Sequence, residues 1–254
     1  MSRQAWTRDQ LIKTLSLYCQ IPFGRIHARN PAVIELAEHI DRTPSAVALK
    51  LVNFASLDPE LRKRQIKGMG NTSAADRAIW AEFYGNWDAL ANNSIESEST
   101  EDGDESAQLL NPDSSIPIDA TETSGVVAIR RGQSFFRAAV LAANDSKCCI
   151  TGITSAPLLR ASHIIPWSRN PSLRLDPRNG ICLNALHDAA FDRGLITFTE
   201  RFDLRVSKRL KDEIPICIYR EMFEMREGAS VRIPERFVPT QDMLEFHRRN
   251  IFVA

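Results

Sequence analysis

The chain has 254 residues, of which 43% are hydrophobic and 25% are charged, as in a globular protein with one large or two small domains. No apolar run approaches the ~20 residues that cross a bilayer, and the N-terminus lacks the apolar segment of a secretory signal. The composition therefore excludes a membrane-spanning protein, and we expect a cytoplasmic one. The five cysteines form no C-x-x-C pair, which favours reduced core thiols over a structural zinc site.

The formal net charge of zero hides an uneven distribution. Residues 92–124 hold nine acidic residues and no Lys or Arg, which leaves 32 basic residues against 23 acidic ones, a net charge of +9, in the remainder. Such a stretch cannot bury enough apolar surface to offset its ordering entropy, so we expect a disordered acidic linker over residues 92–125. The linker is either a plain tether or a segment that competes with a nucleic acid for a basic groove.

The first 91 residues are predicted to form a small helical domain, because four polar residues stand where they would cap helices. Proline follows two of these caps, at a position that suits the first turn of a helix. The predicted helices run from the cap Thr7 to about Gln20, from Asn30 to Ile40, from Thr43 to about Phe54, and from Ser73 toward Tyr84.

The segment ELAEHI-DRT-PSAVALKLVNF is similar to a helix-turn-helix, with Ala37, Val47 and Leu51 turned inward. In that motif the second helix enters the major groove, so Lys50 and Asn53 are its expected DNA contacts. The adjoining outward positions are apolar and read base edges poorly. A small helical packing or oligomerisation domain is therefore the alternative interpretation.

The remainder, residues 126–254, is predicted to be mixed, which makes the whole chain α+β. Apolar periodicity and turn residues set the expected elements. These are a helix over 132–144, strands over 158–164 and 180–183, a helix that carries His187, a β-hairpin of 196–198 with 204–206, and a closing helix over 240–250.

One stretch, LLRASHIIPWSRNPSLRLDPRNGICLNALHDAAFD from Leu158 to Asp192, concentrates the residues best suited to phosphodiester chemistry. His163 ends an apolar run, Asn179 lies sixteen residues on in a Pro-Arg-Asn-Gly turn, and His187 follows eight residues later. The string RGQSFFR precedes the stretch and FDRGLI closes it. Together these motifs, spread over about residues 130–250, resemble the HNH endonucleases of bacterial restriction type.

The resemblance implies a β-hairpin followed by a helix around one divalent metal ion, the ββα-metal fold. The family's first His is the general base and its Asn holds the loop that orients this His, which gives these roles to His163 and Asn179. A neutral imidazole accepts a proton near neutral pH, and an amide donates and accepts at once. The alternatives are a satisfied core histidine and an asparagine that only favours a turn.

The same resemblance makes His187 the metal ligand on the helix. The other metal ligands match the family less well. Ser162 stands where relatives often carry an Asp or His, and its hydroxyl would bind the metal through water. Asp192, in the FD-x-G string, is the preferred further ligand, with Asp188 as the alternative. Mg²⁺ is the expected metal, ahead of Mn²⁺, Ni²⁺ and Zn²⁺. Asp192 could instead end the helix or pair with Arg193.

These observations predict a metal-dependent DNA endonuclease with a role in restriction or anti-phage defence, and a homodimer if both strands are cut. The expected divisions are a DNA-binding domain over 1–91, the linker over 92–125 and the nuclease domain over 126–254. The alternatives are a homing-type nuclease and a non-catalytic DNA-binding regulator. In the nuclease domain the expected DNA contacts are Arg131, Gln133, Arg137, Arg160 and Arg178.

Overall fold

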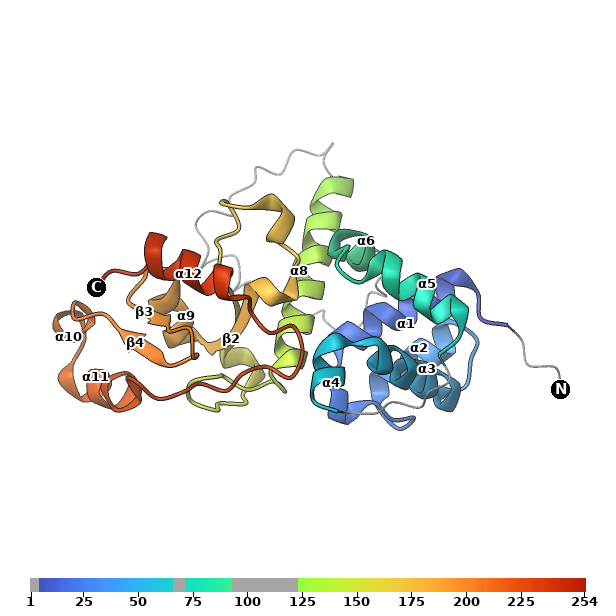
Figure 1. The fold of residues 1–254 in the computed structure, drawn as a ribbon, viewed down its shortest axis with the longest axis horizontal. Coiled ribbons are helices and arrows are strands. Elements are labelled where there is room, and N and C mark those ends of the chain that lie inside the picture. The colour runs from blue at the N-terminus through green and yellow to red at the C-terminus, as the bar shows by residue number, and fades with distance from the viewer. Residues whose placement is uncertain (1–4, 66–71, 93–122) are drawn as a thin grey trace.

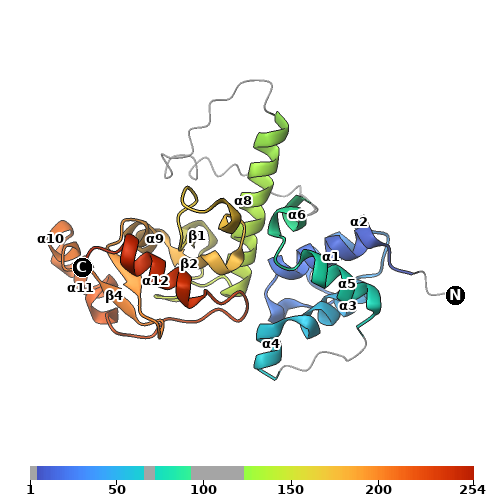
Figure 2. The ribbon, with the colours of Figure 1, turned by 45° about the horizontal axis from the view of Figure 1, so that its top comes forward.

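The computed structural model describes residues 5–65, 72–92 and 123–254, with side chains in the last range described from residue 129 onward. The expected linker over 92–125 lies almost wholly outside these residues. In both ribbon views a helical half and a mixed half flank one long helix, α8 (Figure 1, Figure 2). Within the part of the chain described, no helix is long and apolar enough to cross a membrane.

The N-terminal half is helical, as predicted, and local capping explains where its helices begin. All four expected caps accept a backbone hydrogen bond in the first turn, and two of them form capping boxes. The helices are α1 (Arg8–Gln20), α2 (Pro31–His39), α3 (Pro44–Leu57), α4 (Pro59–Lys63), α5 (Ala74–Phe83) and α6 (Trp87–Asn92), with a 3-10 turn at Phe23–Arg25.

The C-terminal half combines helices with two small antiparallel sheets, each of two strands. Its strands lie close to their predicted positions, which confirms the α+β class with a helical N-terminal region. The elements are α8 (Thr123–Ala143), β1 (Leu159–His163), β2 (Gly180–Asn184), α9 (Ala185–Asp192), β3 (Ile196–Phe198), β4 (Leu204–Val206), α10 (Leu210–Glu213), α11 (Ile216–Met222) and α12 (Gln241–Asn250).

The sheet of β1 and β2 is enclosed by α8 and α9. The register places Leu159 opposite Asn184 and His163 opposite Gly180. A Cβ at Gly180 would lie 2.3 Å from the side chain of Val140 on α8, so only glycine allows the helix to approach this strand so closely. The end of β1 that carries His163 is therefore packed directly against α8.

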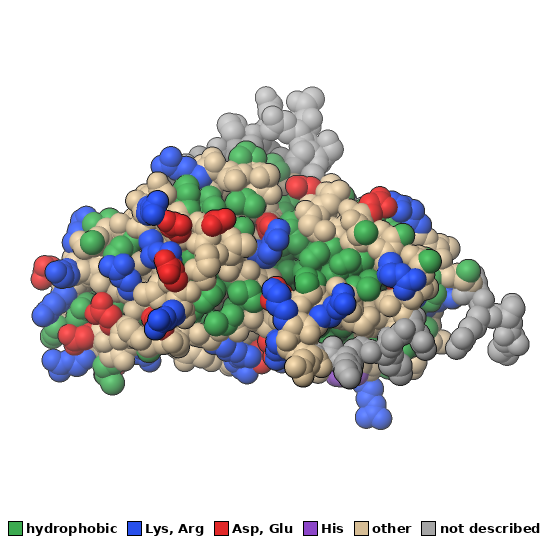
Figure 3. All heavy atoms as spheres, in the orientation of Figure 1, with side chains coloured by type: hydrophobic (Ala, Val, Ile, Leu, Met, Phe, Trp, Pro, Cys, Tyr) green, Lys and Arg blue, Asp and Glu red, His purple; other side chains and the backbone are tan. Residues whose placement is uncertain are grey.

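The two halves share one continuous hydrophobic core. Trp87 of α6 contacts Phe135 of α8, with 6.5 Å between ring centroids, and Phe237 packs edge-on against Trp87 at 5.5 Å. The fully buried side chain of Arg236 donates hydrogen bonds to the backbone carbonyls of Tyr18 and Ile21. Hydrophobic side chains also gather at the surface around the seam between the halves (Figure 3). The N-terminal half is thus packed onto α8, not merely connected to it through the chain.

The structure corrects the expected DNA contacts of the helix-turn-helix. The helix pair α2 and α3 is present, and its inward residues are buried as predicted. However, Lys50 is only 8% exposed, and its ammonium forms an ion pair with the buried Asp76 at 2.7 Å. Asn53 is also buried and donates to the same carboxylate at 3.4 Å. Because α5 covers this face of α3, neither side chain is presented to a DNA groove.

Candidate active site

His163 is the last residue of β1, and its ring is half-buried. Its Nε2 lies 2.9 Å from the backbone oxygen of Arg174. A carbonyl oxygen can only accept, so Nε2 carries the proton and Nδ1 is the basic nitrogen of the neutral ring. Burial lowers the pKa of His163, and the hydrogen bond to Arg174 partly offsets that effect. The imidazole is therefore neutral at pH 7 and able to accept a proton.

Asn179 closes the loop between β1 and β2. Its Oδ1 accepts from the backbone nitrogen of Ile165 at 2.8 Å, and its Nδ2 donates to the backbone oxygens of Ile165 and Leu173. The side chain is 1% exposed and uses both ends of its amide. These bonds hold together the two sides of the loop that supplies the carbonyl partner of His163, which suits the positioning role that the motif implies.

The hydroxyl of Ser162 on β1 lies against α9, a helix that carries two carboxyl groups. Ser162 is 3% exposed and donates a hydrogen bond to Asp188 on α9. Asp192 lies four residues further on, on the same face of the helix. Asp192 is exposed, yet partial desolvation and the neighbouring Asp188 raise its pKa to about 7. Burial also raises the pKa of Asp188. Crowded carboxyl groups of this kind attract a cation.

His187 does not fit its predicted role as a metal ligand. The residue is fully buried, with 0% exposure. Its Nδ1 lies 2.7 Å from the side-chain nitrogen of Asn184, and its Nε2 lies 2.9 Å from the backbone oxygen of Met222. Since both ring nitrogens are hydrogen-bonded inside the protein, neither offers a lone pair to a metal. The residue that faces Ser162 is Asp188, its neighbour in the chain.

Two residues that the sequence reasoning missed hold α9 in place. Asn184 caps the helix by accepting from the backbone nitrogens of Leu186 and His187, while its amide nitrogen contacts Thr151 and the His187 ring. At the other end, His247 of α12 stacks on Phe191 with 3.8 Å between centroids. Asn184 could have been predicted as a helix N-cap, since asparagine is a favoured capping residue and this one directly precedes the predicted helix. The contact of His247 with Phe191 depends on packing between residues distant in the sequence, so no local sequence pattern predicts it.

Arginines from three elements lie near the carboxyl groups. Arg137 on α8, Arg160 on β1 and Arg193 after α9 all lower the pKa of Asp188 through their charge, which places them close to it. Arg137 donates to the backbone oxygen of Leu159, and Arg160 to that of Pro157. The sequence reasoning missed Arg193 as a candidate phosphate contact. It interacts electrostatically with both aspartates.

The remaining predicted DNA contacts are more scattered. Arg178 pairs with Asp176 at 2.6 Å and keeps 43% of its side chain exposed. Arg131 and Gln133 lie on α8, where Gln133 is exposed and Arg131 is half-exposed.

The polar set fits a hard cation better than a transition metal. Among the described residues, no group of three or more His, Cys, Asp or Glu side chains is arranged to hold a metal ion. Ser162, Asp188 and Asp192 nevertheless offer a hydroxyl and two carboxylates. Mg²⁺ typically binds in this way, through one or two carboxylates, with water and substrate phosphates completing the shell. The residues present thus fit Mg²⁺ if the substrate itself contributes ligands.

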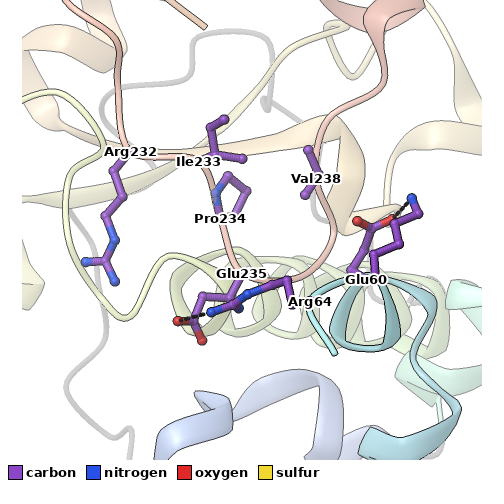
Figure 4. Close-up of a pocket in the computed structure, with 8 residues that line it drawn as sticks. Glu60, Arg64, Arg232, Ile233, Pro234, Glu235 and Val238 are labelled. Carbon is purple, nitrogen blue, oxygen red and sulfur yellow. Dashed lines mark hydrogen bonds and ion pairs between the residues drawn. The ribbon is translucent and has the colours of Figure 1, made fainter. Parts of the chain in front are cut away.

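A groove lies elsewhere, at the seam between the halves (Figure 4). Its volume is about 390 Å³, and an ion pair of 3.4 Å between Arg64 and Glu235 lies within it. Arg232 and Ile233 contribute to its wall. None of the predicted site residues lines this groove, so the groove is not part of the candidate active site.

Comparison with known proteins agrees with this geometry. Residues 148–199 match the family model described as HNH endonuclease. The C-terminal part therefore contains an HNH domain, and this domain indicates nuclease activity in general. No curated protein matches the chain. The matched segment contains β1, β2, α9 and β3, and with them His163, Asn179, Ser162 and both aspartates.

Proposed function

We propose that the protein is a metal-dependent DNA endonuclease. The proposal rests on the last two residues of β1. One of them would help to bind a cation, and the other would act as the general base. Ser162 is bonded to Asp188 beside Asp192, and His163 is oriented by the carbonyl of Arg174 so that Nδ1 is its basic nitrogen. A phosphodiester bound at this strand end would need both groups, the cation site to neutralise charge and His163 to take up the proton.

The chain's own residues account for several parts of the reaction. Nδ1 of His163 accepts a proton from the attacking water, which its lowered pKa permits at physiological pH. Asn179 keeps the loop closed behind this ring. Arg137, Arg160 and Arg193 supply positive charge for the phosphate oxygens. Ser162, Asp188 and Asp192 would hold the divalent ion, which supplies stabilisation of negative charge on the phosphate and the leaving oxygen.

The proposed biological role rests on the family resemblance alone. The string from Gly132 to Gly194 is similar to restriction-type HNH nucleases, which suggests defence against foreign DNA. Cutting both strands with one site per chain would call for a homodimer. Mg²⁺ is the metal that the oxygen donors favour, ahead of Mn²⁺, Ni²⁺ and Zn²⁺.

Plasmid cleavage tests the proposal directly. The purified chain is incubated with supercoiled plasmid, methylated and unmethylated, in Mg²⁺, Mn²⁺, Ni²⁺, Zn²⁺ or EDTA. We expect metal-dependent nicking or linearisation, and a loss of about 10²–10⁴-fold in rate for H163A, as when a general base is removed. His27 is an exposed histidine of the N-terminal half, so H27A is the matched control and should cut normally.

A non-catalytic DNA-binding protein is the second candidate. It is favoured by the serine at position 162 and by the buried ring of His187, which leave only two carboxylates for a metal. This alternative predicts plasmid binding without cleavage in every metal. Equal, metal-independent cutting by wild type and H163A would instead indicate a contaminating nuclease and would remove the support for the enzyme.

A further inference from the structure

The imidazole of His163 is enclosed by two aromatic rings from different elements. Phe136, on α8 and 3% exposed, lies parallel to it with 4.0 Å between centroids and 5° between planes. Trp167, in the loop after β1, meets it nearly at a right angle, at 5.5 Å and 88°. One ring faces the imidazole while the other is perpendicular to it. The plane of the imidazole is therefore constrained from two directions.

Trp167 is itself held by Arg174. The guanidinium of Arg174 lies over the indole, 5.2 Å from its centroid, and its Nε donates to the backbone oxygen of Trp167 at 3.0 Å. The backbone oxygen of the same arginine accepts from Nε2 of His163. Arg174 thus orients the imidazole directly through Nε2 and also holds Trp167, one of the two rings that contact it. Phe136, Trp167 and Arg174 together surround the His163 side chain.

We propose that Phe136 and Trp167 are positioning residues that hold the imidazole of His163 in the orientation required for proton transfer. The proposal rests on the function proposed above. A single hydrogen bond at Nε2 leaves the ring free to rock about that bond, and the direction of Nδ1 would then vary. Stacking by Phe136 and edge contact by Trp167 remove this freedom. Small misplacements of a catalytic group lower the rate strongly, since the reacting atoms must be aligned.

A packing role alone would give a different dependence on side-chain shape. A leucine at position 136 fills most of the space of a phenylalanine but offers no flat face to the imidazole. If Phe136 only fills the core, F136L should cost stability and leave catalysis unchanged. If it positions His163, F136L should lower kcat by roughly tenfold or more with little change in KM.

Chemical rescue separates the general base from the residues that position it. H163G should be inactive and should regain activity when free imidazole is added, because the ligand can enter the space between Phe136 and Trp167. In H163G/F136L and H163G/W167L, half-maximal rescue should need several-fold more imidazole, because each lost ring contact weakens binding. Mg²⁺ is the metal for this assay, since imidazole competes poorly for it.

Three controls complete the experiment. F54L removes an equally buried ring from the N-terminal half and should leave kcat unchanged after a check of folding by circular dichroism. Wild type with imidazole corrects for metal binding by the additive. W167F, which keeps an aromatic edge, should restore most of the kcat that W167L loses. If F136L fails to fold, W167L and W167F still decide the matter.

Different results would overturn the proposed nuclease and the positioning role. Absence of cleavage by wild type, or undiminished cleavage by H163A, would overturn the proposed nuclease and this inference with it. Cleavage by wild type with normal kcat in F136L and W167L, or equal rescue of all three H163G proteins, would overturn only the positioning role. Reduced kcat with preserved KM, together with weaker rescue, supports it.

Discussion

The guanidinium of Arg236 lies over the ring of Tyr18, 4.6 Å from its centroid, and donates to the backbone oxygen of that same residue at 2.7 Å. The two residues are separated by more than two hundred positions in the sequence, and Arg236 is 1% exposed. A second hydrogen bond of 2.6 Å reaches Ile21. A side chain from the C-terminal half thus satisfies backbone carbonyls at the end of α1.

Replacing Arg236 should destabilise the whole chain. We expect R236M to lower the free energy of unfolding by roughly 3–5 kcal/mol, since two buried carbonyls lose charged donors. Urea denaturation measures the change. R64M is the control at the same seam, because the exposed Arg64–Glu235 ion pair should contribute less than about 1 kcal/mol. Similar small losses in both variants would contradict a structural role for Arg236.

The shared core also predicts that the C-terminal half depends on the helical half for its folding. A fragment of residues 123–254 would expose Phe135 and Phe237, which pack on Trp87 in the intact chain. We expect this fragment to aggregate or to melt well below the full chain, and coexpressed residues 1–92 to restore its solubility. A monomeric fragment with the melting temperature of the full protein would show that the two halves are independent domains.

Lys50 should affect stability and not DNA binding. K50M leaves Asp76 buried without its partner, which costs roughly 3–5 kcal/mol when a buried pair is broken. K50M/D76L removes both charges and should recover part of that loss. Neither variant should change the salt dependence of DNA binding, whereas R160A should reduce its slope if Arg160 contacts a phosphate. A reduced slope in folded K50M would restore the helix-turn-helix hypothesis.

The metal ligands can be separated by calorimetry with Mn²⁺ as the probe. We expect D188N and D192N to weaken binding at least tenfold, because each removes one of the two carboxylates proposed to hold the ion, Asp188 bonded to Ser162 and Asp192 next to Asp188. H187Q should bind the metal normally but unfold more easily, since His187 bonds to Asn184 and Met222 inside the core. Lost affinity in folded H187Q, with normal affinity in both aspartate variants, would return the ligand role to His187.

His247 should make stability depend on pH. Burial lowers its pKa to about 4 in the folded protein, against an ordinary value of 6.5, so the unfolded chain binds the proton more tightly. The stability of the neutral form is therefore complete above pH 6.5 and declines as the pH falls toward 4. The loss should reach roughly 3 kcal/mol. H247Q should flatten this part of the stability profile, and an unchanged profile would show that folding does not shift the pKa of this ring.

Local patterns explain why much of the fold was predictable. The caps Thr7, Asn30, Thr43 and Ser73 act on backbone groups two or three residues away, so the residues that decide a helix start are adjacent in the sequence. The strands on either side of Asn179 were predictable for a related reason, because the hairpin loop and its turn residues are contiguous. The positions of His163 and Asn179 at the end of the hairpin followed from this local order.

The order of the elements, the helix starts and the stretch that carries the motif follow from residues that are close together in the chain. Which side chains of that stretch face one another depends on the packing of distant elements. His187 and Asp188 are neighbours, yet successive helix residues point about 100° apart, and packing on Met222 turned the histidine inward and the aspartate toward Ser162. Likewise, α5 covers Lys50 and Asn53, and Arg236 reaches α1 from the far end of the chain. Such outcomes depend on contacts between residues distant in sequence, which periodicity and spacing do not encode.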